Sequence, residues 1–478
     1  MRLYVILRYS GLVMLFAALF MAVSAVVSFL NGMDSSFYPL VMSSLLTVLM
    51  GSFPMFFVPK IEQISNKEGF CIVVGSWIMA CVVGMFPYLM WGGEFTLMNA
   101  WFESVSGFTT TGATIFSDVE ILPKSIIMWR SFTHWIGGMG VLVFIMAFLP
   151  LSGARNMYIM KAESPGPEVS KLVPKVRTTA KWLYSVYIAL TVLLFVLLLF
   201  GDMTPFEALN AAVATTGTGG FGWKNDSIAS FSSYSQIVIA VFMVLSAINF
   251  TSYFMIVKGN FKEAFTTEVK VFLGIVGVST IAIAFNVRGM FGSFGEALKH
   301  SFFNFASLIS STGYATADFD LWPAFAKTLL VLAMFVGACA GSTGGGIKVS
   351  RIVIMFKVMG RELIAALRPR QVKKITVDGQ TQDKDVVRAV YGYMFCFITV
   401  FVTSIIIVSF DGRDLVTNFT SVASAMGNMG PGLAGVGPTM NYGSFSVLSK
   451  LVLIFDMLAG RLEFYPILLL LIPSTWRK

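Results

Sequence analysis

The sequence predicts an all-α polytopic membrane protein, and three observations support this fold class: the composition, ten long apolar stretches and a motif that occurs four times. Of 478 residues, 56% are hydrophobic and 12% are charged, whereas a soluble domain has about 25% charged residues. This composition excludes a soluble enzyme, a disordered scaffold and a secreted disulfide framework. In such a chain the apolar surface faces lipid, and the few polar groups mark the functional parts.

Ten stretches are long enough to cross a hydrocarbon core of about 30 Å as helices. The first has an apolar run of about 22 residues, which is longer than the apolar region of a signal peptide, so we expect it to remain as a spanning helix. Ten spans place both termini on the same side of the membrane. The predicted spans are 9–30, 38–59, 70–91, 126–150, 182–201, 234–257, 270–287, 322–347, 389–410 and 445–472.

The distribution of Lys and Arg predicts the orientation of these spans. With the N-terminus in the cytoplasm, 25 of the 34 basic residues fall in cytoplasmic segments and seven in external segments, as the positive-inside rule requires. The net charge of +9 therefore reflects membrane topology, and no nucleic-acid partner is expected. We predict a multi-pass protein of the cell inner membrane with both termini cytoplasmic.

The repeated motif lies in external segments that are too long and too apolar to be ordinary loops. In each copy a polar residue stands nine positions before a glycine, and small or apolar residues lie between them. Each copy predicts a short half-helix, a glycine-rich loop and a following span. The four copies are 103–112 (ESVSGFTTTG), 210–219 (NAAVATTGTG), 304–313 (NFASLISSTG) and 421–430 (SVASAMGNMG).

This repeat predicts the architecture: four units of span, pore half-helix, filter loop and span around a pseudo-fourfold pore, preceded by a two-helix hairpin. Irregular backbone at membrane depth is tolerated only where it is buried in protein or lines a watery cavity, and four units around an axis enclose such a cavity. The predicted units are the hairpin 1–68, repeat 1 at 69–180, repeat 2 at 181–268, repeat 3 with a gate loop and a cytoplasmic connector at 269–388, and repeat 4 at 389–478.

The four glycine loops predict a binding site for a monovalent cation. Each half-helix points its partly negative C-terminal end at the axis, and the loop carbonyls can replace the water shell of the ion. Close packing of Gly and Thr between helices is the alternative, and four copies in register argue against it. The predicted filter residues are Thr110, Thr111, Gly112, Thr218, Gly219, Ser311, Thr312, Gly313, Asn428, Met429 and Gly430.

These motifs resemble those of a known family, the membrane subunit of bacterial Trk-type potassium uptake systems, within the Trk/Ktr/HKT superfamily of cation transporters. The resemblance covers essentially the full length and rests on the four loops, on 341–351 (GSTGGGIKVSR) and on 460–466 (GRLEFYP). It implies potassium as the transported substrate, with no cofactor in this chain. The terminal loop glycines match the family pattern associated with potassium preference; a sodium-coupled or sodium-permeable transporter of the same superfamily is the alternative.

The resemblance also implies partners, namely a homodimer and a cytosolic regulatory subunit that binds nucleotides. Two basic connectors, 151–181 and 357–388, are candidates for docking that subunit. Solvated linkers that contact anionic lipids are the alternative interpretation of the same segments.

A glycine-rich stretch predicts a gate below the filter. Residues 337–346 contain five glycines, too many for a stable helix, and a helix that begins near Pro323 brings this stretch to mid-membrane or below. We therefore expect a flexible intramembrane loop that blocks the pore; a packing face of small residues is the alternative. The predicted gate residues are Gly341, Gly344, Gly345, Gly346, Lys348 and Arg461.

Charged residues near the predicted pore each have two interpretations. Arg461 lies in mid-span, where a charge is costly and must face protein or water; it is either a gating charge beside the loop or half of an ion pair with Asp456 or Glu463. Lys348 either closes the gate loop or is a snorkelling anchor at the boundary. For Glu103 we favour a structural role over the attraction of cations. The spans contain no cluster of nucleophile and base and no set of metal ligands, so an enzyme is not expected.

Overall fold

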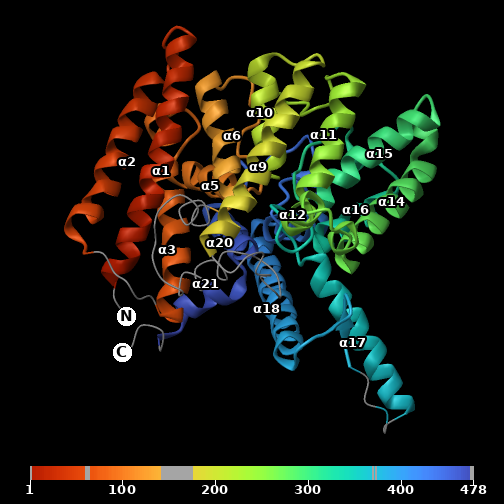
Figure 1. The fold of residues 1–478 in the computed structure, drawn as a ribbon. Coiled ribbons are helices and arrows are strands. Elements are labelled where there is room, and N and C mark those ends of the chain that lie inside the picture. Colours follow the sequence, from red (N-terminus) through yellow and green to blue (C-terminus); the bar gives the residue numbers. More distant parts are fainter. Residues whose placement is uncertain (1–2, 60–64, 141–175, 369–370, 372–373, 474–478) are drawn as a thin grey trace.

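The computed structural model describes residues 3–59, 65–140, 176–368, 371 and 374–473. Most of the long helices run between the same two faces of the molecule (Figure 1). Two short strands, β1 (Thr376–Val377) and β2 (Gln380–Thr381), form an antiparallel hairpin. The helices are α1 (Leu3–Leu30), α2 (Phe37–Phe57), α3 (Asn66–Gly84), α4 (Phe86–Trp91), α5 (Leu97–Phe108), α6 (Lys124–Gly138), α9 (Val176–Leu199), α10 (Pro205–Thr216), α11 (Ser233–Ser246), α12 (Phe250–Val257), α13 (Phe261–Ala264), α14 (Thr267–Val287), α15 (Phe294–Ile309), α16 (Ala324–Val336), α17 (Val349–Leu367), α18 (Lys384–Val408), α19 (Leu415–Gly427), α20 (Val447–Leu462) and α21 (Phe464–Leu471).

The first two helices form a hairpin at one edge of the molecule (Figure 1). They cross at Gly11 and Gly51, where a Cβ on either residue would lie within 2.7 to 2.8 Å of the carbonyl oxygen of the other. Because neither residue has a side chain, the two backbones approach closely, as is common between membrane helices. The outer side of α2 exposes large apolar side chains such as Phe53, Phe56 and Phe57, and this face suits contact with lipid.

Six helices are long and apolar enough to cross a membrane, or seven if the bent pair α11 and α12 counts as one span; this count covers the described residues. Three of the ten predicted spans are shorter or interrupted, and a fourth, 234–257, is bent. In the predicted span 126–150, α6 ends at Gly138, and residues 141–150 lie outside the described residues. In 322–347, α16 ends at Val336 and an irregular segment follows. In 445–472, the helix is interrupted at Glu463.

The predicted span 234–257 consists of two helices and not of one continuous helix. The chain bends by 92° between α11 and α12, and Asn249 stands at the break. Its side chain accepts a hydrogen bond from the backbone N–H of Thr251 at 2.8 Å, which makes Asn249 the N-cap of a new helix. A second break separates α20 from α21 at Glu463, whose φ is +64°.

Four short helices, α5, α10, α15 and α19, occupy the positions of the predicted half-helices. Each begins at a side chain that accepts a hydrogen bond from a backbone N–H of the first turn, which is the preferred way to start a helix. Their C-terminal residues are buried, so each helix runs from the surface into the interior. The four capping residues are Thr96, Thr204, Ser293 and Asp414.

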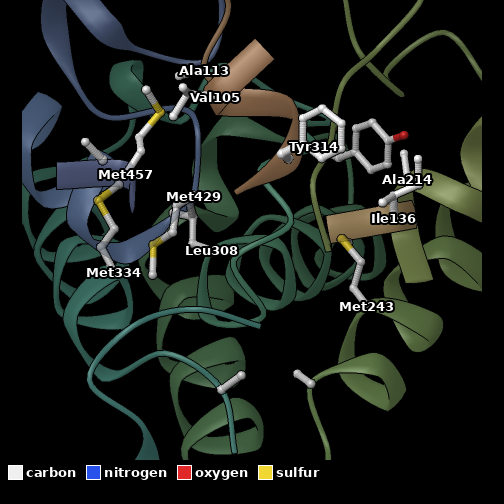
Figure 2. Packing of buried hydrophobic residues seen from close by; sticks show 14 of the residues in the cluster. Val105, Ala113, Ile136, Ala214, Met243, Leu308, Tyr314, Met334, Met429 and Met457 are labelled. Atoms are coloured by element: carbon white, nitrogen blue, oxygen red, sulfur yellow. The ribbon is translucent and has the colours of Figure 1, made fainter. Parts of the chain in front are cut away.

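Methionines fill the core beside the fourth of these helices. Met334 of α16 and Met457 of α20 lie next to Met429, which follows α19 (Figure 2). All three are at most 1% exposed. The unbranched thioether side chain adapts to irregular gaps, so these residues support a loop whose backbone is irregular.

Candidate functional site

Each of the four short helices ends in a loop with the same backbone signature. Just beyond the helix a residue other than glycine has a φ between +54° and +59°, and two positions later a glycine has a φ between +73° and +89°. The left-handed conformation is costly for residues with a Cβ and is freely available to glycine. The first set is Thr110, Thr218, Ser311 and Asn428, and the second set, which we name the glycine ring, is Gly112, Gly220, Gly313 and Gly430.

The second loop shifts the predicted register by one residue. Gly220, and not Gly219, has the conformation of Gly112 in the first loop. The hydrogen bonds agree, because the N–H of Gly219 donates to Ala214 as the N–H of Thr111 donates to Ser106. The predicted alignment used the polar residue nine positions earlier as its anchor, and this spacing is not kept in the second loop. Gly219 therefore corresponds to Thr111.

The glycine ring closes because each glycine packs against the preceding position of the next loop. A Cβ on Gly112 would collide with the carbonyl oxygen of Gly219, and a Cβ on Gly220 with that of Thr312. A Cβ on Gly313 would likewise collide with the carbonyl oxygen of Met429. The fourth contact returns to the first loop, since a Cβ on Gly430 would lie 2.8 Å from the carbonyl oxygen of Thr111.

These four contacts bring the carbonyl oxygens of four loops together, and a cavity of about 140 Å³ adjoins them. All four glycines of the ring line this cavity, together with residues that follow the loops, such as Thr114, Asn225 and Tyr442. The arrangement offers neutral oxygen atoms, which are the ligands that replace the water shell of an alkali cation.

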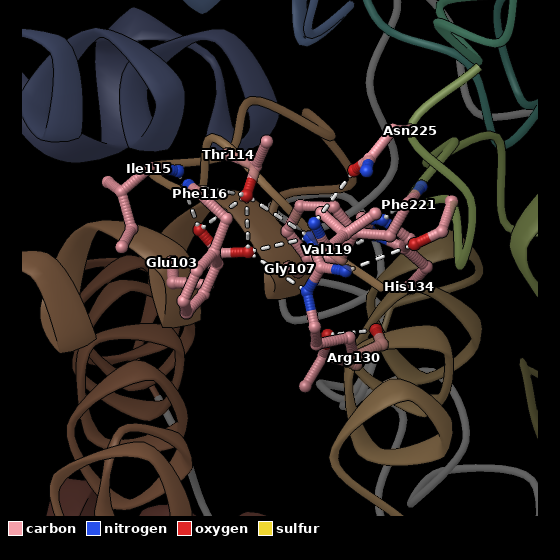
Figure 3. A network of polar contacts seen from close by, with 12 residues as sticks. Glu103, Gly107, Thr114, Ile115, Phe116, Val119, Arg130, His134, Phe221 and Asn225 are labelled. Carbon is pink, nitrogen blue, oxygen red and sulfur yellow. Dashed lines mark hydrogen bonds and ion pairs between the residues drawn. The ribbon is translucent and has the colours of Figure 1, made fainter. Parts of the chain in front are cut away.

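An ion pair fastens the first loop to the second (Figure 3). Arg130 of α6 contacts Glu103 of α5, with Nε 2.9 Å from the carboxylate, and both side chains are at most 1% exposed. The same guanidinium donates to the carbonyl of Gly222 at 3.1 Å and lies 4.1 Å from the ring centroid of Phe221. Glu103 also accepts from Thr114 at 3.0 Å. The contacts of Glu103 are thus those of a structural residue.

His134 forms a second connection between these two loops. Its Nδ1 lies 2.9 Å from the carbonyl oxygen of Gly107, and its Nε2 lies 3.1 Å from the backbone nitrogen of Phe221. Because a backbone N–H can only donate, Nε2 accepts and Nδ1 carries the proton. The imidazole also fills the space where a side chain of Gly219 would stand. A neutral His134 therefore holds the second loop against α5.

The fourth loop is joined to the first by Asn428. Its Nδ2 donates to Thr111 Oγ1 at 3.0 Å and to the carbonyl of Met457 at 2.8 Å. The fourth loop is further held by Tyr442, whose hydroxyl donates to the carbonyl of Gly430 at 2.8 Å. Asn428, which stands where the other loops have Thr or Ser, thus links the fourth loop to the first.

The predicted gate loop lies directly against the loops that form the ring. The backbone N–H of Gly345 donates to Ser311 Oγ at 2.6 Å. A Cβ on Gly344 would lie 2.8 Å from the carbonyl oxygen of Ser310, and one on Gly345 would collide with the carbonyl oxygen of Gly427. Glycine is therefore required at both positions for this close approach.

Backbone hydrogen bonds join the gate loop to the break between α11 and α12. The N–H of Cys339 donates to the carbonyl of Ala247 at 3.0 Å, and the N–H of Phe250 donates to the carbonyl of Gly341 at 3.1 Å. Within the loop, Gly341 and Gly346 have φ values of +69° and +83°. The loop thus pairs with the polar backbone groups that the interrupted helix leaves without helical partners.

Three buried cations surround the gate loop. Arg461 donates to the carbonyl of Thr343 in the loop at 2.6 Å and to the carbonyl of Gly137 at the end of α6, also at 2.6 Å. Lys348 donates to the carbonyl of Gly344, and its side chain is 1% exposed, so it does not reach the membrane surface as a snorkelling anchor does. Arg351 pairs with Glu463.

The two acidic residues that sequence reasoning offered as partners of Arg461 have other contacts. Glu463 contacts Arg351, and Asp456 accepts a hydrogen bond from Ser404 at 2.8 Å. The guanidinium of Arg461 bridges the gate loop and α6 through the carbonyl oxygens of Thr343 and Gly137.

Sequence reasoning missed His134, Arg130 and Gly220. The pair Gly219 and Gly220 offered a signal for the last, because either glycine could end the second loop. His134 and Arg130 lie far from their partners in the second loop along the chain, and they carry no local pattern.

A helical fold with many spans, four loops that meet in a ring of glycines and carbonyl oxygens, and a glycine-rich segment against that ring together define a membrane transport protein for cations. Residues 40–478 match the family model TrkH, described as a cation transport protein. The chain therefore belongs to the TrkH family of cation transport proteins, which is a transporter family and not a family of enzymes.

Individual relatives agree with this assignment and confirm the resemblance inferred from the motifs. The Trk system potassium uptake protein TrkH of Escherichia coli K12 is 34% identical over 425 residues, which cover 87% of each chain. The TrkG protein of the same organism is 33% identical, with the same coverage. The crystal structure of the potassium transporter TrkH from Vibrio parahaemolyticus matches with a TM-score of 0.89 and 32% identity over the full length of both chains.

Proposed function

We propose that this chain is the potassium-translocating membrane subunit of a Trk-type uptake system and that K+ enters the cell through the glycine ring. The observation that carries this proposal is the closed cycle of contacts among the four loops, with carbonyl oxygens at each contact. Neutral oxygens at a fixed spacing replace the water shell of a monovalent cation. The C-terminal ends of the four short helices add a favourable negative potential.

The filter in this proposal consists of the predicted loop residues together with Gly220. The four units of span, short helix, loop and span then surround the ion as a pseudo-fourfold pore, with the hairpin of α1 and α2 at its edge. The backbone signature that the four loops share supports this division into repeats. The excess of Lys and Arg in alternate connecting segments supports cytoplasmic termini in the inner membrane.

Potassium-dependent growth tests the proposal directly. The chain is expected to restore growth at low potassium to a cell that lacks its own uptake systems, and the purified protein is expected to carry K+ faster than Na+ into liposomes. Equal rates for the two ions would favour the sodium-permeable alternative, and the absence of flux for both in a folded protein would reject the proposal.

The gate in this proposal is the loop 337–348 together with Arg461. The support is steric, since Gly344 and Gly345 lie against the carbonyls of the third and fourth loops. A regulatory partner then acts by moving this loop. We propose a homodimer with a cytosolic nucleotide-binding subunit, supported by membership in a family whose relatives are named as components of Trk uptake systems. The basic segment that follows α17 is the proposed docking region.

Replacing Arg461 by alanine is expected to raise K+ flux. The guanidinium makes charge-assisted hydrogen bonds to the loop and to α6, and such bonds contribute about 1.5–3 kcal/mol each. Flux through the purified protein in liposomes should increase about tenfold or more. Arg461→Lys keeps the positive charge but lacks the planar guanidinium. Its K+ flux should lie between that of the wild type and that of Arg461→Ala.

The matched control for this prediction is Arg413→Ala. Arg413 donates to Ser444 and precedes the first residue of α19, whereas Gly427, which contacts the gate loop, is the last residue of that helix. Loss of the Arg413 side chain should therefore leave flux unchanged. If Arg461→Ala conducts at the wild-type rate, Arg461 has a purely structural role.

A further inference from the structure

Glu268 joins the two ends of the gate loop. It lies in the first turn of α14, a helix that packs beside the loop-bearing pair α16 and α17. One carboxylate oxygen, Oε1, accepts hydrogen bonds from the N–H of Ala340 at 2.7 Å and from the N–H of Ser350 at 3.0 Å. Residues 341–349, which contain the glycines against the ring, lie between these two points. One oxygen atom therefore holds the residues on both sides of the segment 341–349.

The bond to Ser350 also completes the start of α17. The first N–H groups of a helix have no partner within the helix, and they are usually satisfied by a capping side chain. The residue at the N-cap of α17, Lys348, makes no capping bond of this kind in the described structure, and it has a φ of +81°. Glu268 supplies the missing acceptor from another helix. A carboxylate at this place also interacts favourably with the positive end of the helix dipole.

The charge of Glu268 is balanced within the same cluster. Among the described residues that surround the gate loop, the cations are Lys348, Arg351 and Arg461, and the anions are Glu268 and Glu463. Glu463 contacts Arg351, whereas Glu268 lies within electrostatic range of Lys348. Hydrogen bonds from N–H groups to a carboxylate are roughly twice as strong as those between neutral groups.

We propose that Glu268 is a positioning residue of the gate: it clasps Ala340 and Ser350 so that Gly344 and Gly345 stay against the filter loops. This proposal rests on the proposed gating function of the loop. Glu268 touches neither the ring nor the ion, and it acts through the loop. Opening requires the clasp to release at least one of its two N–H groups.

A matched pair of variants separates the clasp from a general effect of charge. Glu268→Gln keeps an acceptor oxygen at the same reach and removes the charge, whereas Glu268→Asp keeps the charge and withdraws the oxygen by one methylene. The amide oxygen of Glu268→Gln still accepts both bonds, but more weakly, so the clasp predicts a smaller rise in flux for Glu268→Gln than for Glu268→Asp. For Glu268→Asp it predicts a rise in K+ flux of about tenfold, corresponding to the loss of about 1.4 kcal/mol. A role that depends on charge or on the helix dipole predicts the opposite order.

Cys339 provides a second readout that a merely structural role would not change. It is fully buried beside Ala340, and the other cysteines, Cys71, Cys81 and Cys396, can be replaced by serine. In this background, the protein is placed in liposomes and a water-soluble thiol reagent is added on the side that its cytoplasmic face occupies. Glu268→Asp and Glu268→Ala should increase the rate at which this reagent modifies Cys339. Glu268→Gln should increase that rate less than Glu268→Asp does.

The outcomes distinguish failure of this proposal from failure of the gate itself. If Glu268→Asp and Glu268→Gln both show wild-type flux and labelling while a deletion within the loop raises flux, the clasp is rejected and the gate stands. If the deletion also leaves flux unchanged, the gate is rejected. Should Glu268→Ala fail to fold, the aspartate and glutamine variants still decide the question, because each keeps a polar group of similar size.

Discussion

Gly220→Ala is expected to abolish potassium-selective uptake. The new Cβ would collide with the carbonyl oxygen of Thr312, a backbone atom that cannot turn away, and Gly220 has a φ of +73°. The left-handed conformation alone costs roughly 1–2 kcal/mol for a residue with a side chain, and the third loop must also move. Potassium uptake should fall by more than about 100-fold, which corresponds to ~2.7 kcal/mol, in a growth assay and in liposome flux.

The matched control for this substitution is Gly277→Ala in α14. A Cβ at Gly277 meets no atom within 4 Å, and alanine favours helix, so folding and uptake should be kept. Uptake by Gly220→Ala within about threefold of wild type would show that closure of the ring at this position is not needed for transport.

A double substitution tests the one-residue shift of the second loop. Gly219→Ala should also reduce uptake, but its Cβ collides with the side chain of His134 and not with backbone. Combining it with His134→Ala opens that space and should restore part of the uptake. Adding His134→Ala to Gly220→Ala should not restore uptake. Rescue of Gly220→Ala by His134→Ala would contradict the proposed register.

Deletion of residues 344–346 should convert the protein into an ungated potassium conductor. It removes the two glycines that lie against Ser310 and Gly427 and the N–H that donates to Ser311. With that barrier gone, K+ flux without any regulatory partner should rise by more than about tenfold. The measurement is flux into liposomes that contain the purified chain alone.

The ratio of K+ to Na+ flux serves as the internal control for this deletion. If flux rises because a barrier below an intact filter is gone, the preference for K+ is kept. A rise in which both ions pass equally would mean that the deletion has disturbed the filter. Unchanged flux in a monodisperse, folded variant would count against the loop as the barrier.

The parts of the fold that could be predicted from sequence are those set by local patterns. Length and hydropathy locate α1, α2, α9, α14 and α18, with predicted ends that differ from the observed ones by at most six residues. The four short helices could be located because each precedes a glycine loop, a polar residue stands nine positions before a glycine of that loop, and this pattern occurs four times. The pattern is a weak predictor in one copy, and its occurrence in four copies in the same order makes the prediction strong.

The parts that could not be predicted depend on contacts between distant segments. The break before α12 has no Pro or Gly, and the cap Asn249 favours a new helix there only because the gate loop supplies partners for the free backbone groups. The clasp by Glu268 joins residues that are 72 and 82 positions away. The shift to Gly220 follows from packing against Thr312 in another repeat, which no spacing within one loop can reveal.

The pairing of the gate loop with the broken helix has a consequence for hydration. The carbonyl of Ala247 and the N–H of Phe250 are satisfied by loop residues, and so is the carbonyl of Ser246, which accepts from Thr343. When the loop moves away, these groups lose their partners at membrane depth, and each would cost several kcal/mol if it stayed dry. In the proposed gating motion, water must therefore follow the departing loop. The conducting state would then be hydrated at this place, and its free energy would depend on the activity of water as well as on the ion.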